Sequence, residues 1–113
     1  MLIVDDHATF RATARALLEA DGLDVVGEAC DGTSALEAVD RLRPELVLLD
    51  VQLPDMDGFA VAEALTRRAS SPFVVLTSSR DALDLGSLVS TCGARAFVPK
   101  AELSGAGLRA LIE

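Results

Sequence analysis

The sequence has few of the cysteine and histidine residues that stabilise small domains through disulfides or bound metal ions. It contains no tryptophan or tyrosine, four phenylalanines, two cysteines and one histidine. Cys30 and Cys92 are too few for a disulfide framework and lack the C-x-x-C spacing of a metal or redox site, so we expect reduced thiols that pack as small core residues. No apolar run approaches the ~18 residues of a membrane span, and no basic leader precedes the first apolar stretch. We therefore expect a cytoplasmic protein without a membrane segment.

Basic residues are also scarce. The chain has 10 Lys and Arg against 18 Asp and Glu, which gives a net charge of -8. This charge repels a phosphate backbone and argues against direct nucleic-acid binding, whereas it suits protein partners and divalent cations. With 113 residues, of which 50% are hydrophobic, the chain has the size and apolar content of a single domain over residues 1–113.

Short apolar runs alternate with helical patterns, which is typical of β-α-β units around a parallel sheet. We expect strands at residues 2–4, 24–28, 45–49, 73–76 and 95–98. Five helices are expected. Phe10, Ala14, Leu17 and Leu18 lie on the inward face of the first, and a capping box of Ser34 and Glu37 opens the second, which runs through Leu42. The third has Phe59, Ala62 and Leu65 inward, the fourth covers 81–92, and the last follows a cap at Ser104 with Leu108, Leu111 and Ile112 inward. The predicted fold class is α/β, a doubly wound five-stranded parallel sheet in the order 2-1-3-4-5 with helices on both faces.

Polar residues stand where the predicted strands end. They are Asp5, Asp6, Asp50, Thr77 and Lys100. In this strand order they converge on one edge of the sheet, where open α/β folds bind ligands. Two like charges ~4 Å apart repel by ~4 kcal/mol at an effective dielectric of ~20, so the three carboxylates need a cation or must partly protonate. Oxygen ligands with room for water favour Mg²⁺.

A carboxylate beside a metal ion can attack phosphorus and form an acyl phosphate. The Lys100 ammonium and the Thr77 hydroxyl can then share the charge of the transferred group. The residue types at this edge therefore point to phosphoryl transfer.

Four segments, 4–7, 48–58, 75–78 and 93–100, together resemble the receiver domain of bacterial two-component response regulators. The match covers essentially the whole chain and implies a flavodoxin-like fold. The run 97–100 and His7 are most similar to the subfamily that carries a C-terminal helix-turn-helix DNA-binding domain. The resemblance implies a phosphorylation-dependent switch that controls an output, with transcription as the expected one. Whether a DNA-binding domain follows Glu113 stays open.

The resemblance also implies a role for each site residue. Asp50 would accept the phosphoryl group from a cognate histidine kinase. Asp5 and Asp6, with Asp50 and the backbone carbonyl of Gln52, would hold Mg²⁺. Lys100 would bind the phosphoryl oxygens.

The switch residues implied by the resemblance are Thr77 and Phe97, the aromatic side chain that turns inward when Thr77 moves. The face from Thr77 to the last helix would contact an output domain, a partner protein or a second copy of the chain. Gln52 and Ser79 would tune the lifetime of the acyl phosphate. Because neither is acidic or basic, hydrolysis should be slow. No enzyme activity is expected beyond phosphoryl transfer to, and slow hydrolysis from, its own aspartate.

Other interpretations stay open for several residues. Asp5 or Asp6 can cap the first helix, and Asp55 and Asp57 are expected to be loop and helix-cap residues. His7 is expected to have a local, partly exposed role. Because Pro99 precedes Lys100 and Ala101 follows it, the geometry of the peptide bond after Lys100 is open.

Three rival functions also remain open. A phosphatase that uses an aspartyl phosphate usually has Asp-x-Asp at the first strand, whereas this chain has adjacent aspartates. A flavodoxin-like cofactor binder needs a phosphate loop rich in Ser, Thr and Gly, and residues 5–11 are acidic instead. The third rival is a receiver that serves only as a docking module, although the site residues are complete.

Overall fold

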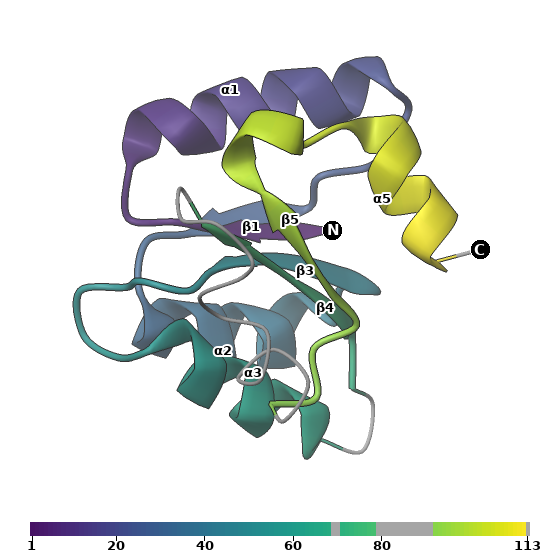
Figure 1. Ribbon diagram of the computed structural model, residues 1–113. Helices are drawn as coiled ribbons and strands as arrows, with labels where there is room; N and C mark the ends of the chain where they lie inside the picture. The colour runs from purple at the N-terminus through teal and green to yellow at the C-terminus, as the bar shows by residue number, and fades with distance from the viewer. Residues whose placement is uncertain (69–70, 79–91, 113) are drawn as a thin grey trace.

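The computed structural model describes residues 1–68, 71–78 and 92–112, which form a five-stranded sheet between two layers of helices (Figure 1). The strands are β1 (Leu2–Val4), β2 (Gly27–Ala29), β3 (Leu46–Asp50), β4 (Phe73–Ser78) and β5 (Ala96–Pro99). The helices are α1 (Ala8–Ala20), α2 (Gly32–Leu42), α3 (Gly58–Thr66), the short 3-10 helix η2 (Lys100–Glu102) and α5 (Gly105–Ile112). The helix expected over 81–92 falls almost entirely outside the described residues.

All strand pairs are parallel, and the strand order is β2-β1-β3-β4-β5. Helices α1 and α5 cover one face of the sheet, and α2 and α3 cover the other (Figure 1). The predicted fold class and strand order are therefore confirmed. In the described ranges, no helix is long and apolar enough to cross a membrane.

The central strand β3 is buried along its whole length, as its apolar run predicted. A core cluster on the α2 and α3 face includes Val61, Ala62 and Leu65, and a second cluster on the α1 and α5 face includes Ala14, Leu18 and Leu108. The expected inward position of Leu17 is wrong, because this side chain lies at the margin of the apolar stripe of α1 and is 41% exposed. Of the two thiols, Cys92 is buried, whereas Cys30 is exposed at the end of β2 and is not a core residue.

Four of the five strands differ from the prediction at one end or both, and the pairing partners explain the differences at the two edges of the sheet. Edge strand β2 is paired only with the three residues of β1, in a register that joins Leu2 to Gly27 and Val4 to Ala29, so it spans 27–29 and not 24–28. At the other edge, Pro99 pairs in register with Ser78, which extends both β4 and β5 beyond the expected ends.

The helix starts depend on aspartate side chains. Helix α2 begins earlier than predicted: Asp31 is its N-cap, and Ser34 is the third residue of a reciprocal capping box with Asp31 rather than the cap itself. Asp57 caps α3 by accepting the Phe59 N–H at 2.7 Å, as expected. The N-cap of α1 is His7, without a side-chain cap, so neither Asp5 nor Asp6 caps that helix.

Candidate functional site

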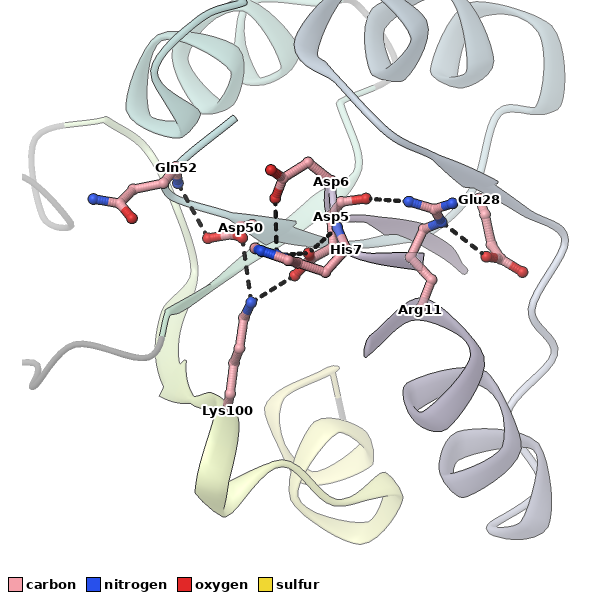
Figure 2. Close-up of polar contacts among 8 residues, drawn as sticks. All are labelled: Asp5, Asp6, His7, Arg11, Glu28, Asp50, Gln52 and Lys100. Carbon is pink, nitrogen blue, oxygen red and sulfur yellow. Dashed lines mark hydrogen bonds and ion pairs between the residues drawn. The ribbon is translucent and has the colours of Figure 1, made fainter. Parts of the chain in front are cut away.

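The carboxyl ends of the central strands bring the predicted polar residues together. Asp50 ends β3 and lies in register beside Thr77 of β4, and Asp5 directly follows Val4, which pairs with Leu49. Asp5 and Thr77 are fully buried, and Asp50 is 4% exposed. Figure 2 shows the carboxylates of Asp5, Asp6 and Asp50 around one small space, with Lys100 reaching up to them from the start of η2.

The loop after β3 is held tightly against the site. Gly58 N–H donates to the Val51 carbonyl at 2.9 Å. A Cβ atom at Gly58 would lie 2.3 Å from the Asp50 carbonyl oxygen, so only glycine allows α3 to begin this close to the end of β3. This contact fixes the backbone that carries Asp50.

Lys100 is the only lysine of the chain, and its ammonium lies between two carboxylates. Nζ is 2.8 Å from Asp5 Oδ2 and 3.3 Å from Asp50 Oδ2, and it also lies 4.4 Å from the centre of the Phe10 ring. Burial lowers the pKa of Lys100, but the hydrogen bond with Asp5 and the Asp50 charge outweigh it and raise the pKa above its usual value. The ammonium therefore stays charged. The peptide bond between Lys100 and Ala101 is trans, like every other peptide bond in the described residues.

The two buried aspartates are shifted in opposite directions. Burial raises the pKa of Asp50; the Gln52 N–H, donating at 3.1 Å, only partly offsets it, and the Asp5 charge raises it further. Burial also acts to raise the pKa of Asp5, but Lys100 and the His7 N–H outweigh it and lower the pKa. The negative charge of Asp5 is therefore stabilised by its surroundings, whereas that of Asp50 is less well compensated.

The acidic cluster has the composition of a cation site. One ligand atom from each of Asp5, Asp6, His7 and Asp50 lies within 4.8 Å of the others. Asp5 Oδ2 is buried, and the Lys100 ammonium lies 2.8 Å from it. Three carboxylates this close together carry more negative charge than one ammonium offsets, so the residues fit a hard divalent ion. The Gln52 backbone carbonyl remains a predicted ligand.

The predicted switch residues lie on adjacent strands. The Thr77 hydroxyl is buried and has no hydrogen-bond partner among the residues that the structure describes, which leaves it available to a group that enters beside Asp50. Phe97 pairs in register with Leu76, and its half-buried ring packs against the core cluster on the α2 and α3 face. Gln52 has an exposed side chain next to the site. Ser79 lies outside the described residues.

A charged network beside the site was not predicted from the sequence. Arg11 Nη1 donates to the Asp5 carbonyl oxygen at 2.6 Å, and its Nε donates to Glu28 at 3.1 Å (Figure 2). Arg15 also binds Glu28, at 2.9 Å, and the Arg15 and Arg11 hydrogen bonds lower the pKa of Glu28 against a smaller opposing effect of burial. The spacing of Arg11 and Arg15, one helical turn apart beside an edge strand with Glu28, was the available signal.

Two further aspartates on the loop after β3 are structural, as expected. Asp57 caps α3, and Asp55 accepts N–H groups of Gly32 and Thr33 at 2.7 and 3.0 Å and the Thr33 hydroxyl at 2.8 Å. The Gly32 and Thr33 N–H groups lower the pKa of Asp55. Its carboxylate therefore fixes the loop after β3 to the start of α2.

The fold and the strand-end residues define an α/β domain with an acidic site at the carboxyl edge of its sheet, and the comparison with known families gives its class. Residues 1–112 match the family described as response regulator receiver domain. The chain belongs to this family, whose members are the phosphorylation-dependent signalling modules of two-component systems. This membership removes the phosphatase and cofactor-binder alternatives.

Individual relatives differ in what is attached to the receiver. The chain is 36% identical over 112 residues to a protein-glutamate methylesterase/protein-glutamine glutaminase of Alkalilimnicola ehrlichii, covering 92% of this chain and 28% of that protein. It is 33% identical over 101 residues to the DNA-binding transcriptional activator EvgA of Escherichia coli K12, covering 89% of this chain and 50% of EvgA. The chain thus spans half or less of these relatives.

Among solved structures, the receiver domain of the putative response regulator NarL from Mycobacterium tuberculosis superposes with a TM-score of 0.87 and 34% identity, covering 98% of this chain and 94% of that one. This likeness extends over the described sheet and helices. It agrees with the match to the receiver family.

Proposed function

We propose that the chain is a phosphorylation switch in which Asp50 accepts a phosphoryl group from a histidine kinase. The observation that carries the proposal is the position of Asp50: a buried carboxylate with a raised pKa at the end of the central strand, 3.3 Å from the only ammonium of a lysine side chain. A charge is avoided at such a place unless it serves a purpose.

The proposed transfer is a displacement at phosphorus. An Asp50 carboxylate oxygen forms the new bond to phosphorus while the bond from phosphorus to the kinase imidazole nitrogen breaks. The imidazole nitrogen keeps the electron pair and takes a proton from solvent. Lys100 and the Thr77 hydroxyl would contact two oxygens of the transferred group.

We propose that Asp5, Asp6 and Asp50, with the Gln52 carbonyl, hold Mg²⁺ for this step. When bound, the ion supplies positive charge that offsets the charge of the phosphoryl oxygens. The side chains themselves supply the oxygen ligands, and the close grouping of their ligand atoms, within 4.8 Å of one another, supports the fit.

The phosphoacceptor is tested by intact-mass measurement after incubation with a small acyl-phosphate donor and Mg²⁺. The wild-type chain should gain the mass of one phosphoryl group, and the gain should vanish with Asp50→Asn or with a chelator. Asp57→Asn is the matched control, because Asp57 lies on the following loop and Asn also caps a helix; it should be phosphorylated like the wild type. Equal modification of the Asp50→Asn chain would overturn the proposal.

We propose that Thr77 and Phe97 carry the switch. A phosphoryl group on Asp50 would attract the Thr77 hydroxyl and leave space that Phe97 fills, which changes the surface formed by β5 and α5. Amide exchange with and without a phosphate mimic should differ over residues 96–112. A change confined to 34–43 would contradict this assignment.

We propose a cytoplasmic regulator whose output is transcription. The output would act through a DNA-binding domain elsewhere in a longer protein or through a partner bound to the surface of β5 and α5. Phosphorylation-linked dimerisation is one form of that contact. Residues 1–113 would then be the receiver domain. The similarity to EvgA supports this output, and the similarity to methylesterases makes an attached enzyme domain the second candidate. The sequence that follows Glu113 in the gene decides between them.

We further propose that Gln52 and Ser79 set the lifetime of the acyl phosphate. Their side chains are neutral, so neither provides a strong general base for the attacking water. Replacing either residue should change the decay rate of the phosphorylated chain while the extent of phosphorylation is unchanged. Unchanged decay in both variants would place the control of water access elsewhere.

A further inference from the structure

His7 lies at the acidic cluster but has no part in the proposed transfer. Its Nδ1 atom is 3.1 Å from Asp5 Oδ1 and 3.0 Å from Asp6 Oδ1 (Figure 2). Its backbone N–H donates to Asp5 Oδ1 at 2.8 Å, so the same residue approaches one carboxylate oxygen from both its main chain and its ring. The position of the ring beside the two aspartates is therefore tied to the backbone at the start of α1.

The spacing of these three atoms matches neighbouring ligands of one ion. Two ligands at a right angle around a small divalent ion, each ~2.1 Å from it, are about 3.0 Å apart. The two distances from His7 Nδ1 to the carboxylate oxygens are 3.1 and 3.0 Å. The cluster that includes Asp50 is also compact, with all four ligand atoms within 4.8 Å of one another.

Two further observations favour a ligand over a structural side chain. Asp5 is fully buried, and because the Lys100 ammonium lies 2.8 Å from its Oδ2 atom, the oxygen that faces the His7 ring is Oδ1, at 3.1 Å from Nδ1. His7 itself is 69% exposed, so its ring is not required for packing and has open access from solvent. As the N-cap of α1 it makes no side-chain hydrogen bond to the helix.

We propose that His7 is an additional ligand of this metal centre, through Nδ1, and that it makes the centre prefer first-row transition ions such as Mn²⁺ and Ni²⁺ over Mg²⁺. The inference rests on the metal site of the proposed function. Carboxylate and carbonyl oxygens alone suit Mg²⁺, whereas imidazole nitrogen suits transition ions. A mixed set of three carboxylates and one imidazole therefore binds the transition ions more tightly.

The consequence is a receiver whose metal occupancy depends on which ions are available. A Mg²⁺ ion gains little from imidazole, so His7 leaves the Mg²⁺ form nearly unchanged. A transition ion gains one nitrogen ligand and follows the usual order, with Ni²⁺ bound more tightly than Mn²⁺. His7 is thus a specificity-determining residue for the metal.

The test uses the untagged chain, in which His7 is the only histidine. Pulsed electron paramagnetic resonance of bound Mn²⁺ detects nitrogen that is directly coordinated, and ¹⁵N-labelled histidine distinguishes the imidazole from any other nitrogen. We expect an imidazole coupling in the wild type and none in His7→Gln. No phosphoryl donor is present, so the result does not depend on activity.

Calorimetric titration measures the preference. In His7→Gln the affinities for Mn²⁺ and Ni²⁺ should fall by about tenfold or more, since losing even an outer-shell partner of a ligand costs 10- to 100-fold. The Mg²⁺ affinity should fall less, so the selectivity ratio drops. Asp57→Asn, which changes an exposed carboxylate outside the cluster, should leave all three affinities unchanged.

The outcomes separate this inference from the proposed function. Mn²⁺ that binds without imidazole coupling, and equally well in His7→Gln, overturns the role of His7 and leaves the metal site intact. Mn²⁺ binding that is not weakened by Asp6→Asn or Asp50→Asn overturns the metal site and the inference with it. Imidazole coupling together with a lowered selectivity ratio in His7→Gln supports both.

Discussion

Two groups of aspartates near the carboxyl edge of the sheet differ in how their oxygens are supplied with hydrogen-bond donors. At the start of α2, Asp31 and Asp55 accept backbone N–H groups and hydroxyls, and those donors lower the pKa of Asp55. In the site, Asp50 accepts one backbone N–H and shares one ammonium with Asp5, and burial raises its pKa. The first group stabilises the fold, whereas the negative charge of the second is only partly compensated.

The comparison teaches that the donor supply, and not the residue type, separates structural from functional carboxylates here. A carboxylate with several N–H donors is held in its charged form by the protein. A buried carboxylate with few donors and a like charge nearby depends on a cation from outside or on a new covalent partner. The predictions below test whether the two groups respond oppositely to substitution.

The largest effect is expected for Lys100→Met. Removing the ammonium leaves Asp5 and Asp50 buried without a positive charge, and breaking a buried pair costs about 3 kcal/mol of unfolding free energy. Because the chain has no tryptophan or tyrosine, urea unfolding is followed by circular dichroism. Added Mg²⁺ should restore part of the loss, since the ion replaces some of the missing charge.

The matched control for that variant is Arg67→Met. Arg67 is 80% exposed and lies 3.8 Å from Glu63, so its loss should cost under about 1 kcal/mol. If Lys100→Met were no less stable than this control, the site would not depend on its ammonium, and the contrast between the two groups of aspartates would weaken.

A smaller effect of opposite sign is expected for Asp50→Asn. Because the raised pKa of Asp50 means that its charged form is disfavoured in the folded chain, the neutral amide should increase the unfolding free energy at neutral pH without metal, by less than the Lys100→Met loss. The same urea series without Mg²⁺ measures it. A loss of stability would indicate that the ion pair with Lys100 outweighs burial and the Asp5 charge.

The sequence predicts the site better than it predicts what supports the site. The strand ends at Asp50 and Thr77 follow from apolar runs that burial imposes on a parallel sheet, and the edge where they meet follows from strand order. The link from Arg11 to Glu28 depends on how α1 lies over the edge strand β2, which no local pattern encodes.

The start of α2 and the burial of Cys30 were predicted wrongly for a similar reason. Ser34 and Asp31 are both good N-caps, and the choice between them is made by tertiary contacts, since the N–H groups at the start of α2 are also bound by Asp55 across the loop. Cys30 was expected in the core, but β2 ends at Ala29 and places the thiol beyond the sheet. Such positions depend on long-range pairing and not on residue type.

The smallest effect on stability is expected for Asp55→Asn, and its dependence on pH has a definite sign. The folded pKa of Asp55 lies below its unfolded value, so its stabilising contribution is present above the unfolded pKa of ~3.9 and is lost as pH falls through the folded pKa. Thermal unfolding from pH ~7 to pH ~3 should show the variant less stable than the wild type at neutral pH, with a difference that shrinks on acidification. Asp57→Asn, which also removes one exposed negative charge but retains a capping side chain, controls for net charge. A difference in stability between Asp55→Asn and the wild type that stays constant with pH would contradict this expectation. That result would mean that the Gly32 and Thr33 N–H groups bind the amide oxygen as well as the carboxylate, and that the donors at the start of α2 do not favour the charged form of Asp55.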